Sequence, residues 1–220
     1  MGDIFAIYKE KGPTSNDIIM QLKKITDTKK VGHAGTLDPL ASGVLVVGVG
    51  REATKKLGDA MEKEKEYIAK IKLGETSSTD DEEGDKTSVQ VSNKPNEQEV
   101  KEVIESFIGS IKQMPPVFSS VKVSGKPAHR LVRSGKRPKL GERDVELKEA
   151  EIIKYSWPYL ELRLVTGSGF YVRSLARDIG EKLKTGGYLA GLERTRVGDF
   201  TKDEAITIEE FSKIYISDTK

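Results

Sequence analysis

Apolar and polar positions along the chain follow two periods, and these predict strands and helices in mixed order. Ile4–Tyr8 and Val44–Val49 are short apolar runs bounded by turn residues, as is typical of buried strands. From Tyr67 to Leu73, and again from Leu160 to Leu164, apolar side chains alternate with polar ones. This two-residue period is that of a half-buried strand. A further short strand is expected at Ile152–Ile153.

Helical periods separate these strands. Thr14 and Asp17 form a capping-box pattern ahead of an apolar stripe, and Thr207 and Glu210 repeat that pattern near the end of the chain. The predicted helices cover 14–25, 52–61, 96–108 and 172–183, followed by a last one from Thr207. A turn and strand are expected at 189–200. Strands interleaved with helices predict an α/β fold.

Three other stretches are predicted to lie outside regular structure. Gly32–Gly48 holds four glycines and a proline, so we expect its first twelve residues to form neither helix nor strand. Glu62–Glu66 alternates in charge, which is typical of a solvated face. Gly74–Ser88 is polar and acidic and is expected to be a surface loop.

Asp38 is the only acidic residue in Gly32–Gly48. Pro39 moves the backbone of Asp38 away from the helical region. A short loop leading into a buried strand can hold a carboxylate on a rigid support, as an acid–base or covalent site requires. The same dipeptide also fits an ordinary turn with an Asx hydrogen bond. Both interpretations are open at the level of the pattern.

Composition excludes several classes of function. The chain has no cysteine and only two histidines, His33 and His129. Disulfides, thiolate metal sites and cysteine nucleophiles are therefore excluded, and we expect no metal and no cofactor. The acidic stretch at 74–88 lacks the spacing of a calcium loop. No leader and no long apolar run is present, so we expect a cytoplasmic protein without membrane contact.

Charge is nearly balanced overall, at +2, but not locally. Only Glu142 opposes the eight basic residues Lys122, Lys126, Arg130, Arg133, Lys136, Arg137, Lys139 and Arg143. Glycines and prolines make this stretch loop-like. A basic, glycine-punctuated loop suits a phosphate backbone, so 113–143 is predicted to contact RNA. A solvated loop is the alternative.

The stretch around Asp38 resembles the signature GHxGTLDPLAxGVL of the TruB family of tRNA pseudouridine synthases. Further groups match the family's other motifs in order, so that the resemblance covers nearly all 220 residues. These groups are Lys9 and Gly12 with Ser15–Asp17; Glu66–Tyr67, Leu73–Gly74 and Thr79-x-Asp81-x-x-Gly84; Gln113-x-Pro115-Pro116-x-Phe118-Ser119-Ser120-x-Lys122 with Gly125–Pro127; and Gly169-x-Tyr171-x-Arg173-Ser174-Leu175 with Leu192-x-Arg194-Thr195.

The resemblance implies a large, mixed, mostly antiparallel sheet flanked by helices, with the basic segment as a loop insertion. It implies a single catalytic domain over residues 1–220, without the C-terminal PUA domain that bacterial members carry. The implied reaction is isomerisation of uridine 55 in the T loop of tRNA to pseudouridine. We expect a monomer that needs no cofactor and acts on the T-arm stem-loop.

The resemblance also implies roles for individual residues. Asp38 would be the catalytic residue, and Arg173 would pair with it to keep it ionised. Tyr171 would line the pocket and handle the proton lost at the end. Tyr67 would stack on the extruded uracil, and His33 would fill the space that the base leaves. The positions implied to shape the pocket or hold RNA are Lys9, Leu192, Lys122, Lys126, Arg130 and His129, the last standing where the family usually has a tyrosine.

Two alternatives use the same features differently. A non-catalytic RNA-binding or tRNA-folding protein would need the basic segment but not Asp38 with Arg173. A phosphate-handling enzyme would use the glycine-rich loops, but the turn at Gly167–Gly169 lacks the full G-x-G-x-x-G fingerprint and no Walker lysine follows it.

Overall fold

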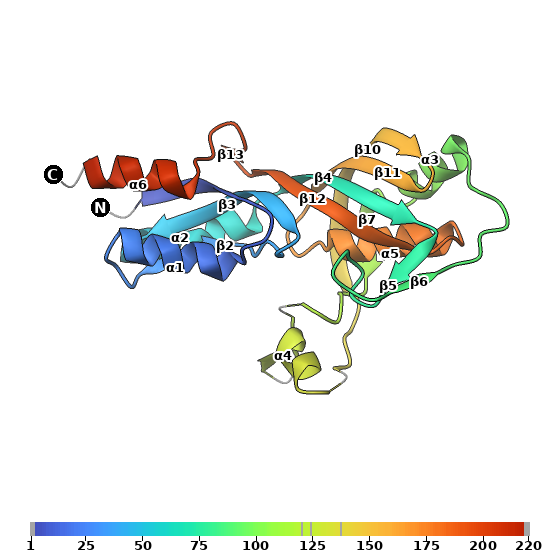
Figure 1. Cartoon of the computed structure of the whole chain (residues 1–220), viewed down its shortest axis with the longest axis horizontal. Coiled ribbons are helices and arrows are strands. Elements are labelled where there is room, and N and C mark those ends of the chain that lie inside the picture. Colours follow the sequence, from blue (N-terminus) through green and yellow to red (C-terminus); the bar gives the residue numbers. More distant parts are fainter. Residues whose placement is uncertain (1–2, 120, 124, 137, 218–220) are drawn as a thin grey trace. The chain divides into compact units, whose positions relative to one another are not determined.

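The computed structural model describes residues 3–119, 121–123, 125–136 and 138–217 (Figure 1). In chain order the elements are β1 (Asp3–Lys9), α1 (Ser15–Ile25), β2 (Val31–Ala34), β3 (Ala41–Val49), α2 (Arg51–Glu62), β4 (Lys65–Leu73), β5 (Glu75–Ser77), β6 (Lys86–Ser88), α3 (Glu97–Glu105), β7 (Gly109–Gln113), β8 (Lys122–Val123), β9 (Lys126–Pro127), α4 (Ala128–Arg133), β10 (Arg143–Ser156), β11 (Tyr159–Thr166), α5 (Val172–Lys182), β12 (Gly187–Val197), β13 (Phe200–Thr201) and α6 (Ile208–Ser217).

The main sheet has the strand order β1-β3-β12-β4-β11-β10-β7, with β2 on β3 and β13 on β12. The β3–β12 pair is parallel, whereas β1–β3, β2–β3, β10–β11 and β7–β10 are antiparallel. The expected mixed fold with a large, mostly antiparallel sheet is confirmed. The chain divides into two compact units, one comprising Met1–Ile68 and Leu192–Lys220 and the other Ala69–Gly191.

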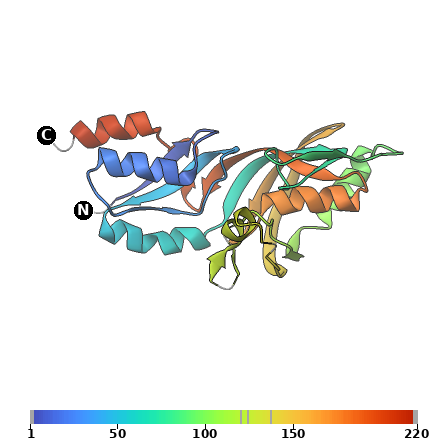
Figure 2. The same cartoon turned by 60° about the horizontal axis from the view of Figure 1, so that its bottom comes forward.

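In the first unit, helices cover both faces of the sheet (Figure 2). Leu45 and Val47 of β3 pack with α1 and with Phe211 of α6. Val44 and Val46, which point the other way, pack against α2. Successive strand residues face opposite sides, so a continuous apolar run such as Val44–Val49 is what a strand buried on both faces requires. Each fully buried aliphatic side chain contributes about 1.5–3 kcal/mol.

Both predicted capping boxes are confirmed. The Asp17 backbone N–H donates to the Thr14 hydroxyl at 3.1 Å, and the Thr14 backbone N–H donates to the Asp17 carboxylate at 2.8 Å. Thr207 and Glu210 make the same reciprocal pair at the start of α6. Each helix start is therefore set by residues that are three apart in the sequence.

The prediction that Gly32–Gly43 contains no strand was wrong. Residues 31–34 form β2, in which Gly32 pairs with Gly48 of β3. A Cβ at Gly32 would lie 3.3 Å from the Leu57 side chain, and one at Gly48 would lie 3.0 Å from the Ala53 backbone. These glycines bring α2 close to the sheet, whereas the sequence pattern was interpreted as a series of turns.

Other boundaries also differ from prediction. The acidic stretch 74–88 contains the β5–β6 hairpin, and the basic segment, expected as a loop, carries α4 and the β8–β9 pair. Helix α3 ends at Glu105, and Ile108, expected on its inner face, is 45% exposed. Strand β10 begins nine residues before Ile152, at Arg143. Val145 and Leu147 are the buried positions at the start of this strand, but the charged residues around them obscure this two-residue period in the sequence.

The second unit contains the sheet formed by β11, β10, β7 and part of β4, with α5 along one face (Figure 2). Leu175 and Ile179 of α5 are buried. The segment between β7 and β10 leaves this sheet and carries α4 (Figure 1). The first turns of α5 therefore lie beside the point where the basic segment starts, as the contacts described below show.

We expect Gly43→Ala to lower the stability by several kcal/mol. Gly43 has φ +108°, and a Cβ there would lie 2.2 Å from the Arg194 carbonyl oxygen, so neither the backbone conformation nor the space accepts a methyl group. Urea unfolding of the variant measures this loss. The matched control is Gly58→Ala in α2, where nothing lies within 4 Å. That change should stabilise by about 0.5–1 kcal/mol, and equal effects of the two substitutions would contradict the packing argument.

Candidate active site

The loop that carries Asp38 is held on both sides. The buried Ser15 hydroxyl accepts from the Leu37 backbone N–H at 2.8 Å and donates to the Leu37 carbonyl at 3.0 Å. The Ala41 N–H donates to the Asp38 carbonyl, and the Gly12 N–H donates to the Pro39 carbonyl. These bonds tie Asp38 to the start of α1 and to the turn after β1. The expected rigid support is therefore present.

Three neighbouring strands place two cations on either side of a glycine close to this loop. Lys9 of β1 pairs with Gly43 of β3, and Gly43 pairs with Arg194 of β12. Residues in one row across a sheet point to the same face. Gly43 has no side chain, and the Arg194 backbone fills the place that a Cβ would take, with its carbonyl oxygen 2.2 Å from that position. β3 and β12 can approach this closely only at a glycine.

Lys9 is completely buried. Its Nζ donates to the carbonyls of Glu10 at 3.0 Å and Pro13 at 2.8 Å. Burial lowers the pKa of Lys9, and the negative charge of Asp38 opposes that shift. The interaction is mutual, so Lys9 in turn favours the ionised form of Asp38. Lys9 was implied to shape the pocket wall, and the structure adds this electrostatic contact with Asp38.

Arg194 is the centre of the first unit's polar contacts. It is 1% exposed. Its Nε donates to the Val44 carbonyl at 2.8 Å and its Nη2 donates to the Gly35 carbonyl at 3.1 Å. Burial lowers the pKa of Arg194, whereas the hydrogen-bonded side chain of Tyr67 and the charge of Asp38 raise it. Sequence reasoning placed Arg194 in a family motif but gave it no role.

Lys65 is a third buried cation in this unit. It was expected in a solvated charge run, and that expectation was wrong, because the alternation of β4 turns Lys65 inward together with Tyr67. Its Nζ donates to the carbonyls of Met61 at 2.8 Å and Lys63 at 2.5 Å. Burial and the charge of Arg194 lower the pKa of Lys65 to about 8.

His33 and Leu192 lie in the same unit. His33 is part of β2, and its Nδ1 is buried without a hydrogen-bond partner among the described residues. Burial and the charge of Arg194 lower the pKa of His33, so the imidazole is neutral at pH 7. Leu192 pairs with Ala41, three residues after Asp38. The first unit thus contains five implied site residues, namely Lys9, His33, Asp38, Tyr67 and Leu192.

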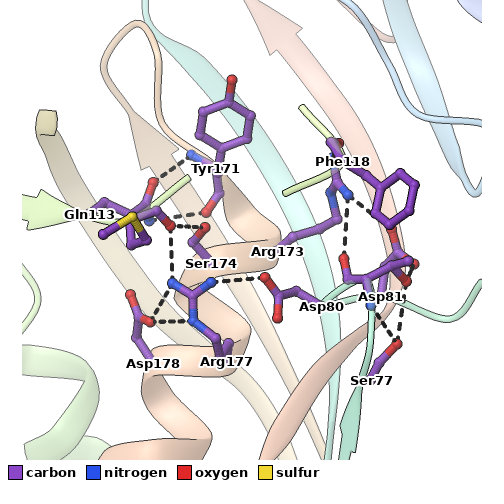
Figure 3. Close-up of polar contacts among 12 residues, drawn as sticks. Ser77, Asp80, Asp81, Gln113, Phe118, Tyr171, Arg173, Ser174, Arg177 and Asp178 are labelled. Carbon is purple, nitrogen blue, oxygen red and sulfur yellow. Dashed lines mark hydrogen bonds and ion pairs between the residues drawn. The ribbon is translucent and has the colours of Figure 1, made fainter. Parts of the chain in front are cut away.

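Arg173 lies in the second unit, where it forms a buried ion pair. Its Nη1 is 3.3 Å from Oδ2 of Asp81, and its Nη2 donates to the Phe118 carbonyl at 2.8 Å (Figure 3). Asp81 is 2% exposed, so the expectation that 74–88 is only a surface loop was wrong at this residue. The sequence signal that could have identified Asp81 is the family motif that contains it, Thr79-x-Asp81-x-x-Gly84. The implied pair of Arg173 with Asp38 stays a prediction.

A second ion pair lies one helical turn further along α5. Arg177 Nη1 is 2.8 Å from Oδ2 of Asp80, and Arg177 Nη2 is 2.8 Å from Oδ1 of Asp178 (Figure 3). Burial raises the pKa of both aspartates, and the charge of Arg177 opposes this. The Met114 carbonyl accepts hydrogen bonds from Arg177 and Ser174. Helix α5 therefore fixes the beginning of the basic segment.

Tyr171 is the N-cap of α5, and its backbone exchanges two hydrogen bonds with the Gln113 side chain. Its phenol points away from the Arg177 cluster in Figure 3. Lys122 and Lys126 lie in the β8–β9 hairpin, and Arg130 lies in α4; all three are exposed. The side chain of His129, and Ser120 and Arg137, lie outside the described residues. The roles implied for these residues stay predictions.

The described part of the chain contains no group of three or more His, Asp or Glu side chains placed to hold a metal ion. Within that same part, no helix is long and apolar enough to cross a membrane.

Comparison with known proteins decides the family. A family model described as TruB family pseudouridylate synthase (N terminal domain) matches residues 23–172. The chain belongs to the TruB family. A model of the tRNA pseudouridylate synthase B C-terminal domain matches residues 173–220. A TruB relative from Parabacteroides distasonis, named tRNA pseudouridine synthase B, is 44% identical over 219 residues, which cover 95% of this chain and 91% of that protein. A relative of the same name from Corynebacterium diphtheriae is 40% identical over 94% of this chain and 71% of its own length.

Two solved structures share the TruB-type fold. The chain matches a chain from a Cbf5-Nop10-Gar1 complex with a TM-score of 0.75 and 29% identity, over 99% of this chain and 55% of that one. It matches a chain from an H/ACA RNP bound to a substrate RNA containing 2′-deoxyuridine with a TM-score of 0.72 and 26% identity, over 99% and 55%. The chain thus spans about half the length of these solved chains.

Asp81→Asn should lower the free energy of unfolding by about 3 kcal/mol, because it removes the buried carboxylate that forms an ion pair with Arg173. The matched control is Asp144→Asn, which breaks an ion pair of similar length, 3.2 Å, to Lys112. The Asp81–Arg173 side chains are 3% and 7% exposed, whereas those of Asp144 and Lys112 are 77% and 66% exposed. The control should cost less than about 1 kcal/mol. Urea unfolding measures the loss of stability in both variants. Losses of similar size would contradict the assignment of Asp81 and Arg173 as a buried ion pair.

The buried Lys65 should make stability rise with pH. Its pKa in the folded protein is about 8, against 10.5 for an exposed lysine, so the unfolded chain binds more protons between these values. The free energy of unfolding of the natural chain, compared with Lys65→Met, should therefore increase from pH 7.5 to pH 10 by up to about 3 kcal/mol. Urea unfolding at several pH values tests this. If the difference in free energy of unfolding between the two proteins stays constant or falls as pH rises, the pKa of Lys65 is not lowered by burial.

Proposed function

We propose that this chain isomerises a uridine in the T loop of tRNA, at position 55, to pseudouridine, with Asp38 as the catalytic residue. The observation that carries the proposal is the setting of Asp38. In a chain of the TruB family, the family's catalytic aspartate lies on a loop held by Ser15, in the field of the buried cations Lys9 and Arg194.

The reaction needs a carboxylate and a dry pocket, but neither an oxidant nor an energy source. The bond between C1′ and N1 breaks, the uracil turns, and a bond forms between C1′ and C5. N1 gains a proton and C5 loses one, so atoms and charge balance within the nucleotide. Lys9 and Arg194 favour the charged form of Asp38, as a nucleophile or base requires.

The target base must leave the stack before its reacting atoms can be reached, at a cost of a few kcal/mol. Tyr67 offers an aromatic ring for the extruded uracil, and stacking of a base on such a ring contributes about 1–3 kcal/mol. The hydrogen bond from Arg194 fixes the orientation of that ring. A neutral His33 suits the place that the base leaves, because an uncharged imidazole can stack without removing a proton.

The basic segment supplies the RNA-binding part of the proposal. Lys122, Lys126 and Arg130 are exposed on the hairpin and helix of this segment. Each phosphate contact made by such a cation releases counterions. RNA affinity should for this reason depend on salt, and we assign the T-arm stem-loop as the part of the tRNA that the chain recognises.

Asp38→Asn should abolish pseudouridine formation, because an amide replaces the carboxylate at similar size. Affinity for a T-arm stem-loop should change by less than about threefold, since phosphate contacts dominate RNA binding. Pseudouridine mapping after incubation, together with filter binding at fixed salt, measures both quantities.

The control for this prediction is Asp59→Asn in α2, which should leave both quantities unchanged. An Asp38→Asn variant that still forms pseudouridine would contradict the assignment of Asp38. A natural chain that binds the stem-loop but forms no pseudouridine would favour the non-catalytic RNA-binding alternative.

A further inference from the structure

A cavity of about 290 Å³ lies at the tip of the β10–β11 hairpin, in the second unit. The residues that line it include Lys70 of β4 and, from the hairpin, Lys154, Trp157, Pro158, Tyr159 and Glu161. The volume is close to the lower end of the range for small-molecule sites, about 300–1,000 Å³. None of these residues has a role in the proposed function, so the cavity is a feature that the function leaves unexplained.

The cavity lies on the outer face of the sheet. In β4, Lys70 is exposed between the fully buried Ala69 and Ile71. Tyr159 is 41% exposed, and the next residue of β11, Leu160, is fully buried. Successive strand residues face opposite sides. Lys70 and Tyr159 therefore point away from the core and toward solvent, where a ligand can reach them.

The turn of the hairpin is fixed to the end of β4. The Leu73 backbone N–H donates to the Pro158 carbonyl at 2.8 Å. A Cβ at Gly74 would lie 3.4 Å from Cζ2 of Trp157, so the indole ring packs against the backbone of this glycine. A hydrogen bond and a ring contact thus hold the tip of the hairpin in place, and the cavity is preformed.

Cations outnumber anions in this cavity, because Lys70 and Lys154 are opposed only by Glu161. Lys154 lies opposite Glu161 in the strand register, but the two side chains form no ion pair. The Lys70 Nζ lies 4.7 Å from the centre of the Tyr159 ring, a cation–π contact. Among the residues that the structure describes, neither lysine has a carboxylate partner. Both ammonium groups can therefore bind an anion.

We propose that this cavity binds one unpaired nucleotide of an RNA, in addition to the nucleotide that reacts. The base stacks on the rings of Trp157 and Tyr159, and its phosphate binds the ammonium groups of Lys70 and Lys154. Every base has a π face, so the site accepts any base. The nucleotide must be unpaired, because neighbouring bases cover both faces of a base within a duplex. The proposal rests on the proposed function only for the class of its ligand, RNA.

The rings favour RNA over an acidic peptide as the ligand. Lysines alone are enough to bind a carboxylate, and an acidic peptide would leave the two aromatic rings without a partner. Aromatic rings combined with basic side chains are the usual composition of a site for single-stranded nucleic acid. The cavity has both kinds of side chain within one hairpin and its neighbouring strand.

Trp157 is the only tryptophan of the chain, so its fluorescence reports on this cavity. Titration of the natural chain with a single-stranded oligouridylate of about six nucleotides should quench this fluorescence, because a base stacks on the indole. The matched ligand is a sugar–phosphate oligomer of the same length without bases, which should leave the fluorescence unchanged. A glutamate-rich peptide tests the other class of ligand. Quenching by the peptide but not by the oligouridylate would overturn the proposal.

Two variants test the two kinds of contact. Lys154→Ala should weaken oligouridylate binding and lower the slope of log K against log salt by about 0.7, the value for one phosphate on a single strand. The matched control is Lys94→Ala, which removes an exposed lysine of the same unit outside the cavity and should change neither quantity. Tyr159→Leu should weaken binding by about tenfold, whereas Tyr159→Phe keeps the ring and should bind as the natural chain does.

The two proposals fail in different ways. No quenching by the oligouridylate, full affinity in Tyr159→Leu, or equal effects of Lys154→Ala and Lys94→Ala would overturn the nucleotide site, whether or not the chain forms pseudouridine. Quenching in a chain that forms no pseudouridine would overturn the proposed function alone. If Tyr159→Leu does not fold by circular dichroism, the comparison of Lys154→Ala with Lys94→Ala decides.

Discussion

The first unit depends on a positive charge that is removed from water, that of Arg194. Burying a guanidinium without partners would cost far more than a small domain's net stability. Here the carbonyls of Gly35 and Val44, the Tyr67 side chain and the charge of Asp38 offset that cost. These partners belong to the turn after β2, to β3, to β4 and to the loop of Asp38. One side chain therefore makes the positions of these four parts interdependent. Gly43 is needed at this level because a Cβ there would overlap the Arg194 backbone.

The second unit uses charge differently. Arg173 and Arg177 are each matched by a carboxylate from the β5–β6 hairpin, and each also donates to a carbonyl at the start of the basic segment. The same two residues therefore hold a hairpin and an arm against one helix. Planar guanidinium groups with several donors can bridge three partners in this way, which a lysine cannot do with comparable geometry.

Local signals in the sequence predicted local structure well, and buried charge was where they failed. Capping boxes and strand periods involve residues close in sequence, so Thr14 and Thr207 could be interpreted directly. Lys65 and Asp81 looked solvated because their neighbours in sequence are charged. The partner of Asp81 is Arg173, 92 residues away, so its pairing has no local signal. Lys65 donates to carbonyls close in sequence, but its burial follows from the inward face of β4 in the folded sheet. The residues around Asp38 could be named only through the family resemblance, since spacing alone was equally compatible with a turn.

The double hydrogen bond of Ser15 links the loop of Asp38, the proposed catalytic residue, to the first turn of a helix. Helix ends fray first, at free energies far below that of global unfolding. Ser15 is the first residue of α1, and the same turn contains the capping box of Thr14 and Asp17. If that turn unfolds, the two hydrogen bonds between Ser15 and the Leu37 backbone break, and the neighbouring Asp38 side chain is no longer held in place. The stability of this first turn of α1 therefore bears directly on the position of Asp38, which lies on a separate loop.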